Sequence, residues 1–398
     1  MTGISQIGRI RLKIRNKIGR IVLPFLALLA LILFLSQWCQ VEKVEMVSDS
    51  SQQFDKAVVT EVITDNLQED GSRVGNQEVK VKFLTGKNKG KEVEAVSTNG
   101  SLYGATCYKG LKVVTLTNQS GDVTITSVYS LNREPYVIGF VLLFFVLICM
   151  VGGKNGIKAV LGLVVTFALV LFFLFPAIYR GMSPINAAII TVIFTTIITI
   201  GILTGYSKKT LASILGTVVG VIISGVTAWA FGKIAGISGY NVSNIDTLIS
   251  VANCTNIKVG DLLFAGILIS SLGAVMDVGL SIASTIAELH SVKPELTWTQ
   301  LFQSGMNVGK DMMGTMANTL ILAFAGGSLS ELLLDYAYDL PYVQLINSYT
   351  IGIEVMQGVA GSIGIILTVP LVSIFSSLLY AKVVVRRERL SEPENVIH

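Results

Sequence analysis

The chain has 398 residues, of which 52% are hydrophobic and only 14% are charged, and its mean hydropathy is +0.67. This is too little charge to cover a soluble globule of that size, so the surplus apolar surface is expected to face lipid. The formal net charge of +4 is too small to indicate a nucleic-acid partner.

The first twenty residues are basic, and a leucine-rich run at 21–38 follows them. A cationic stretch before an apolar run is typical of a signal peptide or of a membrane anchor. No small-x-small cleavage pattern and no lipobox precede Cys39. We therefore expect residues 1–20 to be a basic cytoplasmic N-terminus and residues 21–38 to be an uncleaved first transmembrane helix.

Residues 40–134 have a different character, because β-prone residues alternate or run together there. The clearest segments are Val79–Phe83, Val113–Leu116 and Val123–Val128, and glycine-rich and asparagine-rich turns separate them. Short strands at close spacing predict a small β-barrel of the SH3 or OB type. The segment has no nucleophile or metal-ligand constellation, so a structural or gating cap and a binding role both stay open.

Seven further apolar runs are long enough to cross about 30 Å of hydrocarbon, which takes roughly 20 residues. They lie at 136–152, 157–178, 185–205, 211–235, 261–286, 312–334 and 350–381. The predicted fold class is therefore membrane α-helical, with about eight transmembrane helices and the β-rich domain between the first and the second. Residues 136–382 form a seven-helix membrane domain in this prediction, and Gly326, Gly327 and Pro370 weaken the continuity of its last two helices.

Basic residues in short loops predict the orientation, because such loops stay cytoplasmic. When the spans alternate, the basic N-terminus falls on the same side as Lys154, Lys208, Lys293 and the tail at 383–398. The loop at 335–347 on the other side is acidic. We therefore expect both termini to be cytoplasmic and residues 40–134 to be extracytoplasmic.

The sixth run contains an aspartate inside continuous apolar sequence. A charge at the centre of a membrane helix costs about 2.5–3.5 kcal/mol on insertion scales and usually marks a substrate or ion path. Ser281, Ser284 and Glu288 follow Asp277 at offsets of four, seven and eleven, which places all four on one helix face. A purely structural role for Asp277 is the alternative.

The seventh run repeats this arrangement. Its polar residues at the same offsets are Asn307, Asp311, Gly314 and Asn318, with Lys310 and Thr315 alongside. If the two faces meet, Asp277, Asp311 and Asn318 would line an oxygen-rich cavity suited to a hard cation or to proton relay. The alternative for Asp311 is a carboxylate at a helix N-terminus, where it would satisfy free N–H groups and the helix dipole.

The eighth run combines a carboxylate with small residues. Glu354 could be an outer gate or a coupling carboxylate, or it could lie in water, because this run is longer than a membrane span requires. The glycines predicted to serve close helix packing are Gly216 and Gly220 in the fifth run and Gly358, Gly361 and Gly364 in the eighth.

These runs together resemble the YibE/F-like family of multi-pass bacterial membrane proteins. The residues that carry the resemblance are Gly273–Asp277 with Ser281–Ser284, Gly309–Leu320, and Glu354 with Gly361–Gly364 and Pro370. The turn at Gly152–Gly156 and the β-rich segment are also similar, so the resemblance covers roughly residues 55–382. It implies a bacterial cytoplasmic membrane protein with a presumed transport role, and it implies no particular substrate.

The leading hypothesis is a secondary transporter or channel for a small solute or ion. The alternative is a non-transporting membrane scaffold or sensor whose external β-domain binds a ligand or an envelope partner. Paired intramembrane aspartates also occur in intramembrane proteases, but no G-x-G-D motif surrounds Asp311 and no Tyr-Asp lies in the sixth run. With no phosphate-binding G-x-x-x-x-G-K-[ST] loop either, we expect no enzyme.

The expected partners are the lipid bilayer and a small cation or a proton. No cofactor and no nucleic acid are expected, a metal site stays undetermined, and a homo-oligomer stays open. Cys107 and Cys254 fall on the same predicted side, so a disulfide between them and two free thiols both stay open.

Overall fold

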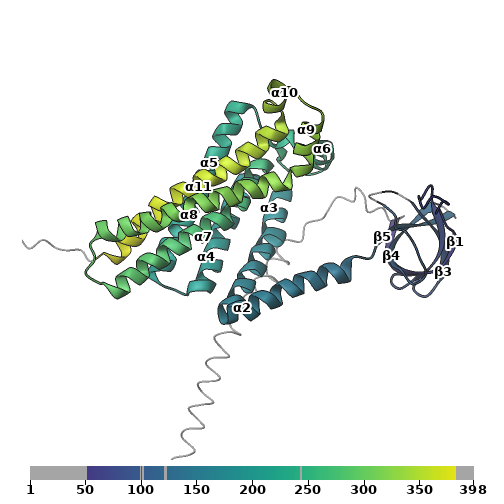
Figure 1. The fold of residues 1–398 in the computed structure, drawn as a ribbon, viewed down its shortest axis with the longest axis horizontal. Helices are drawn as coiled ribbons and strands as arrows, with labels where there is room; N and C mark the ends of the chain where they lie inside the picture. The colour runs from purple at the N-terminus through teal and green to yellow at the C-terminus, as the bar shows by residue number, and fades with distance from the viewer. Residues whose placement is uncertain (1–51, 99, 101–102, 121–122, 243, 382–398) are drawn as a thin grey trace, which may run out of the picture. The chain divides into compact units, whose positions relative to one another are not determined.

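The computed structural model describes residues 52–98, 100, 103–120, 123–242 and 244–381 (Figure 1). The predicted basic N-terminus at 1–20, the predicted first span at 21–38 and the tail at 383–398 lie outside these residues. The chain divides into two compact units, with a boundary in the sequence between Val151 and Gly152. One unit contains a β-barrel, and the other contains the helices after that boundary.

The first unit contains a closed five-stranded barrel. Its strands are β1 (Gln52–Thr64), β2 (Gln77–Phe83), β3 (Glu92–Ser97), β4 (Lys112–Ser120) and β5 (Val123–Leu131). They close in the order β1-β2-β3-β5-β4, and the β3–β5 pair is parallel while the other pairs are antiparallel. Five strands that close in this way are typical of the OB type rather than of a simple hairpin series.

Buried and outward-facing side chains alternate along the strands, and the buried ones form the barrel core. In β2 the residues Gln77, Val79, Val81 and Phe83 are buried, and the residues between them face outward or are half-buried. Because successive side chains of a strand point to opposite faces, this pattern gives one apolar and one solvated face. The predicted strands lie within β2, β4 and β5. The other two strands, β1 and β3, were not predicted.

A buried side chain joins the β3–β4 connection to the barrel. Gln77 is 2% exposed, its Oε1 accepts a hydrogen bond from the Cys107 backbone N at 2.7 Å, and its Nε2 donates to the Cys107 backbone O at 3.3 Å. Gly104 N donates to Tyr129 O of β5 at 2.8 Å. These bonds satisfy buried backbone groups of a loop that has no strand partner of its own.

The helical part begins with α2 (Glu134–Leu169), which contains a break at Gly153, where φ is 53° and ψ is −125°. Glycine adopts this conformation without the steric penalty that a side chain would bring. Helical structure continues through a π-helical turn at Val170–Leu174 to α3 (Phe175–Tyr179). The predicted second and third spans thus lie in one helical element that is interrupted within the predicted Gly152–Gly156 turn.

The remaining helices complete the second unit. They are α4 (Pro184–Thr204), α5 (Lys208–Ala235), α6 (Ile245–Asn253), α7 (Leu262–Val292), α8 (Trp298–Gly327), α9 (Leu329–Ala337), α10 (Tyr342–Ile346) and α11 (Tyr349–Tyr380). Within the described residues, five helical elements are long and apolar enough to cross a membrane, or six if the bent pair α8–α9 is one span. The apolar helices indicate a membrane protein.

One predicted span differs clearly from the structure. The seventh run was expected at 312–334, whereas α8 begins at Trp298 and a bend of 65° separates it from α9. Its start is fixed by a capping box in which Thr297 Oγ1 accepts a hydrogen bond from Gln300 N and Gln300 Oε1 accepts one from Thr297 N. The first turns of α8 are polar on one face, so a search for apolar runs misses them.

Helix α11 is central to the second unit and lies against α5, α7 and α8 (Figure 1). Small residues let these helices approach closely. A Cβ atom built on Gly216 would lie 2.0 Å from Val372 Cγ2, and one built on Gly220 would lie 1.9 Å from Thr368 Oγ1. Such contacts permit no side chain on α5 at these positions, as in other close helix pairs.

Three predicted packing glycines belong to α11 itself. A Cβ on Gly361 would lie 2.6 Å from Leu320 of α8, and one on Gly364 would lie 2.8 Å from Ser224 Cβ of α5. Gly358 is less confined, because its nearest neighbour, Ile321, would be 3.4 Å away. The glycines of α11 therefore face two different helices.

Candidate functional site

Asp277 is the middle residue of the 31-residue helix α7. Its side chain lies on the exposed face, opposite the buried Val275, Val278 and Ile282. No residue in the described part of the chain forms a hydrogen bond or an ion pair with it. An apolar helix thus carries one unpaired carboxyl group at its centre.

The other polar residues of α7 continue toward its C-terminal end. Ser281 and Ser284 are half-buried, and Glu288 is exposed. The backbone O of Ser281 accepts a hydrogen bond from Thr285 Oγ1 at 3.0 Å. The predicted face of α7 therefore lies at the edge of the helix packing and not inside it.

Asp311 lies in the interior of α8, thirteen residues after the helix begins at Trp298. The alternative of a carboxylate in the first turn of a helix is therefore wrong, because the capping box at Thr297 occupies that end. Asp311 is exposed, and no other described residue pairs with it. Thr315, one turn further on, donates from Oγ1 to Met312 O at 2.9 Å.

The packing face of α8 is the side opposite Asp311. Gly305 lies against Ile286 and Ser373, and Gly309 lies against Val369 and Ile282. The residues of α8 that were predicted to line a path are all exposed, and they are Asn307, Asp311, Thr315 and Asn318. Because Asp277 is also exposed, the described part of a single chain does not enclose a cavity between these two faces.

Glu354 meets the bend between α8 and α9. Glu354 Oε1 accepts a short hydrogen bond from Ser328 Oγ, and Ser328 is the residue at which the two helices join. The second carboxylate oxygen, Glu354 Oε2, is buried and has no hydrogen-bond partner in the described chain. Sequence reasoning singled out Glu354 but missed Ser328, although Gly326 and Gly327 had marked a weak point in that helix.

Sequence reasoning also missed a set of buried hydroxyl groups inside the helical unit. Several of them lack a hydrogen-bond partner among the described residues, namely Thr195, Thr199, Ser213, Thr217, Ser224, Ser376 and Ser377. Others bond to the carbonyl four residues earlier, as Thr368 Oγ1 does to Gly364 O at 2.7 Å. Serine and threonine are common in packed membrane helices, so the sequence pattern gave no signal that these hydroxyls were unsatisfied.

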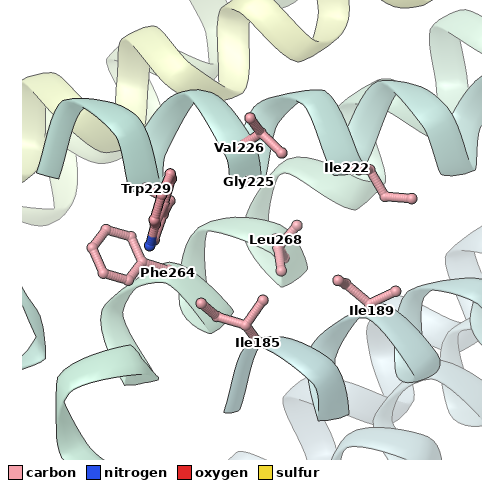
Figure 2. A pocket seen from close by; sticks show the side chains of 8 residues that line it. All are labelled: Ile185, Ile189, Ile222, Gly225, Val226, Trp229, Phe264 and Leu268. Atoms are coloured by element: carbon pink, nitrogen blue, oxygen red, sulfur yellow. The ribbon is translucent and has the colours of Figure 1, made fainter. Parts of the chain in front are cut away.

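A pocket of about 250 Å³ lies between α4, α5 and α7 (Figure 2). Its lining is Ile185, Ile189, Ile222, Gly225, Val226, Trp229, Phe264 and Leu268. These side chains offer no charge to an ion, so the pocket suits a hydrocarbon chain and not a polar solute. It is separate from the carboxylates described above.

The described residues contain no group of three or more His, Cys, Asp or Glu side chains that could hold a metal ion. Cys107, Cys149 and Cys254 are free, with Cys107 buried in the barrel core.

Comparison with curated proteins and with solved structures finds no match for this chain. The family profile described as YibE/F-like protein matches residues 140–382, which is more than half of the 398 residues. This range includes α7, α8 and α11 with all the carboxylates described above. The chain belongs to the YibE/F-like family.

Proposed function

We propose that this protein is a secondary transporter or channel for a small cation or a proton, and that it is not an enzyme. Its path is lined by the polar faces of α7 and α8 and by Glu354 of α11. The observation that carries the proposal is Asp311 with Asn307 and Asn318 on one face of α8, in a unit whose helices are otherwise strongly apolar. Polar and ionisable residues at such positions are costly in a membrane and usually mark a path.

The proposed topology has eight spans in a bacterial cytoplasmic membrane, with both termini in the cytoplasm. The barrel is then extracytoplasmic. Two features support this arrangement: the clustering of lysine and arginine in alternate loops, and the helices that are long enough to span. In this orientation α8 runs outward, so the Ser328–Glu354 contact lies near its extracytoplasmic end.

The test is ion flux into proteoliposomes that contain the purified full-length protein. The probes are H⁺, Na⁺ and K⁺, each supplied as a single imposed gradient. The wild type is expected to move at least one of them, and Asp311→Asn is expected to slow that flux about tenfold or more, since a loss of about 1.4 kcal/mol already gives that factor. Asp246→Asn, the same change in the first turn of α6, is the matched control and should leave the flux unchanged.

Equal flux through wild type and Asp311→Asn would contradict the assignment of the path to α8. Absence of flux for all three ions would contradict the proposal for small cations. Neutral solutes would then be the next class to examine.

Glu354 provides a second and separate prediction. Glu354→Gln keeps an oxygen that can accept the Ser328 hydrogen bond but removes the negative charge, so we expect slower cation flux with an unchanged thermal midpoint. Glu354→Ala removes both, so it should lower the midpoint as well, because the half-buried Ser328 hydroxyl then loses its partner. Wild-type flux in Glu354→Gln would exclude this carboxylate from the path.

The barrel offers an observation that favours a second candidate function, a scaffold or sensor that binds a ligand. Phe54 and Tyr103 are both more than half exposed, and both flank Tyr129, with ring centroids 5.1 and 5.3 Å from it. A contiguous exposed aromatic surface is typical of a binding face. Deletion of residues 50–130 distinguishes the functions, because persistence of flux favours transport by the helices, whereas loss of a cellular phenotype with intact membrane insertion favours the barrel.

A further inference from the structure

The outer face of α8 has no partner within the described chain. We define this face as Asn307, Lys310, Asp311, Gly314, Thr315 and Asn318, all of which are exposed. A Cβ atom built on Gly314 would have no heavy atom within 4 Å. The opposite face of the same helix is closely packed, with Gly309 against Val369 and Ile282. One face of α8 is therefore closely packed, and the opposite face has no packing partner among the described residues.

Lipid is an unsuitable cover for this face. The 30 residues of α8 extend about 45 Å, and Asp311 lies about 20 Å from their start, so it falls within the hydrocarbon when α8 and α9 cross the membrane as one bent span. Charged and amide side chains at that depth almost always face protein or a water-filled cavity. Lys310 and Asp311 therefore need a protein surface, or a water-filled cavity that protein encloses, on this side of α8.

The outer face of α8 is complementary to itself. Lys310 and Asp311 carry opposite charges at adjacent positions, and Asn307 and Asn318 can each donate and accept hydrogen bonds. In a two-fold symmetric contact, residue i of one copy meets residue j of the other, and j meets i. Gly314 lies between Asp311 and Asn318 and lets two helix backbones approach closely. When two copies meet through this face, Lys310 of each copy can pair with Asp311 of the other. All four charges then have a partner.

We propose that the outer face of α8 is closed by the same face of a second copy of this chain, with Lys310 of each copy paired to Asp311 of the other. The contact encloses Asn307, Asp311 and Asn318 between the two copies, so the path is complete only in the dimer. Describing this enclosed lining as a path rests on the proposed function, whereas the pairing itself does not.

The test is disulfide crosslinking in native membranes. The native cysteines are first replaced by serine, and Gly314→Cys is then introduced as the single cysteine, so that a disulfide can form only between two chains. Mild oxidation is expected to convert much of the 42.7 kDa chain to a species of twice that mass. Ile197→Cys on α4, an exposed apolar position, is the matched control and is expected to give little crosslinking.

Charge reversal then examines the pairing. The acidic copy carries Lys310→Asp and the basic copy carries Asp311→Lys, each in the Gly314→Cys background and with a different affinity tag. Each copy alone is expected to lose most of the crosslinked species, because like charges then meet across the contact. Co-expression of the two copies should restore it as a species that carries both tags, since opposite charges face each other again.

Several results would overturn the proposal. Failure of Gly314→Cys to crosslink in membranes would mean that another segment, such as residues 21–38, covers this face. Full crosslinking of either charge-reversed copy alone would disprove the Lys310–Asp311 pairing. If a reversed copy does not insert, the neutral Asp311→Asn is used instead, and undiminished crosslinking would disprove the pairing equally. Crosslinking without ion flux would support the dimer but contradict the proposed transport.

Discussion

Replacing Gly220 by valine is expected to lower the free energy of unfolding of the helical unit by about 2–3 kcal/mol. A Cβ atom at this position would lie 1.9 Å from Thr368 Oγ1 and 3.1 Å from Val275 Cγ1. Thr368 cannot turn aside easily, because it is β-branched and its hydroxyl bonds to Gly364 O of the same helix. Either α5 and α11 move apart or side chains leave their rotamers, and both changes cost packing energy.

The matched control for this prediction is Gly201→Val in α4. Gly201 is also inside a helix, but a Cβ there would have nothing within 4 Å. Both variants change helix propensity alike, so the difference between their thermal midpoints in detergent isolates the packing term. Equal midpoints for the two variants would contradict the close approach of α5 and α11 described above.

Much of the fold could be predicted because lipid-facing helices must be apolar along their whole length. The predicted run at 350–381 and α11 at Tyr349–Tyr380 agree closely for this reason. The barrel was indicated by alternating valines of the kind seen in β2, yet β3 escaped notice. Charged outward positions do not hide a strand by themselves, since Lys80 and Lys82 alternate with buried residues in β2, but β3 is shorter and its buried positions include only Ala95 and Ser97.

The bounds of α8 could not be predicted in the same way. Its N-terminal turns carry polar residues on the face away from the bundle, so mean hydropathy rises only near residue 312. The sequence marks the start of α8 in another way, because Thr297 and Gln300 have the spacing of a capping box. Caps mark a helix start independently of hydropathy, and in an amphipathic membrane helix they are the better guide.

The sequence suggests candidate residues for a site, but it does not give their arrangement. Periodicity places Asp311 and Asn318 on one face of α8, but it does not say which way that face points. The direction depends on which residues pack, and here Gly305 and Gly309 are the side that enters the bundle. The sequence could therefore suggest that the polar faces of α7 and α8 meet, whereas the structure leaves both exposed. That difference is the reason we propose that a second copy completes the path.

The other large effect is expected in the barrel, where Gly104→Ala should lower the free energy of unfolding by about 3 kcal/mol or more. Gly104 has a φ of +94°, which side-chain-bearing residues rarely adopt. Its Cβ atom would also lie 1.9 Å from the backbone O of Thr98, and a backbone atom cannot rotate away. The loop that Gln77 holds through Cys107 would then have to leave the barrel.

Gly110→Ala is the control that separates backbone strain at a positive φ from the close contact with Thr98 O. Gly110 has nearly the same φ, +91°, but nothing lies within 4 Å of its Cβ position. The readout is thiol labelling of Cys107 on heating, in the full-length protein with the other cysteines replaced by serine. Cys107 is buried, and burial raises the pKa of its thiol, so it reacts only when the barrel opens. Gly104→Ala should shift labelling to clearly lower temperature than Gly110→Ala does. Equal shifts would mean that backbone strain alone, and not the contact with Thr98, makes glycine necessary at this position.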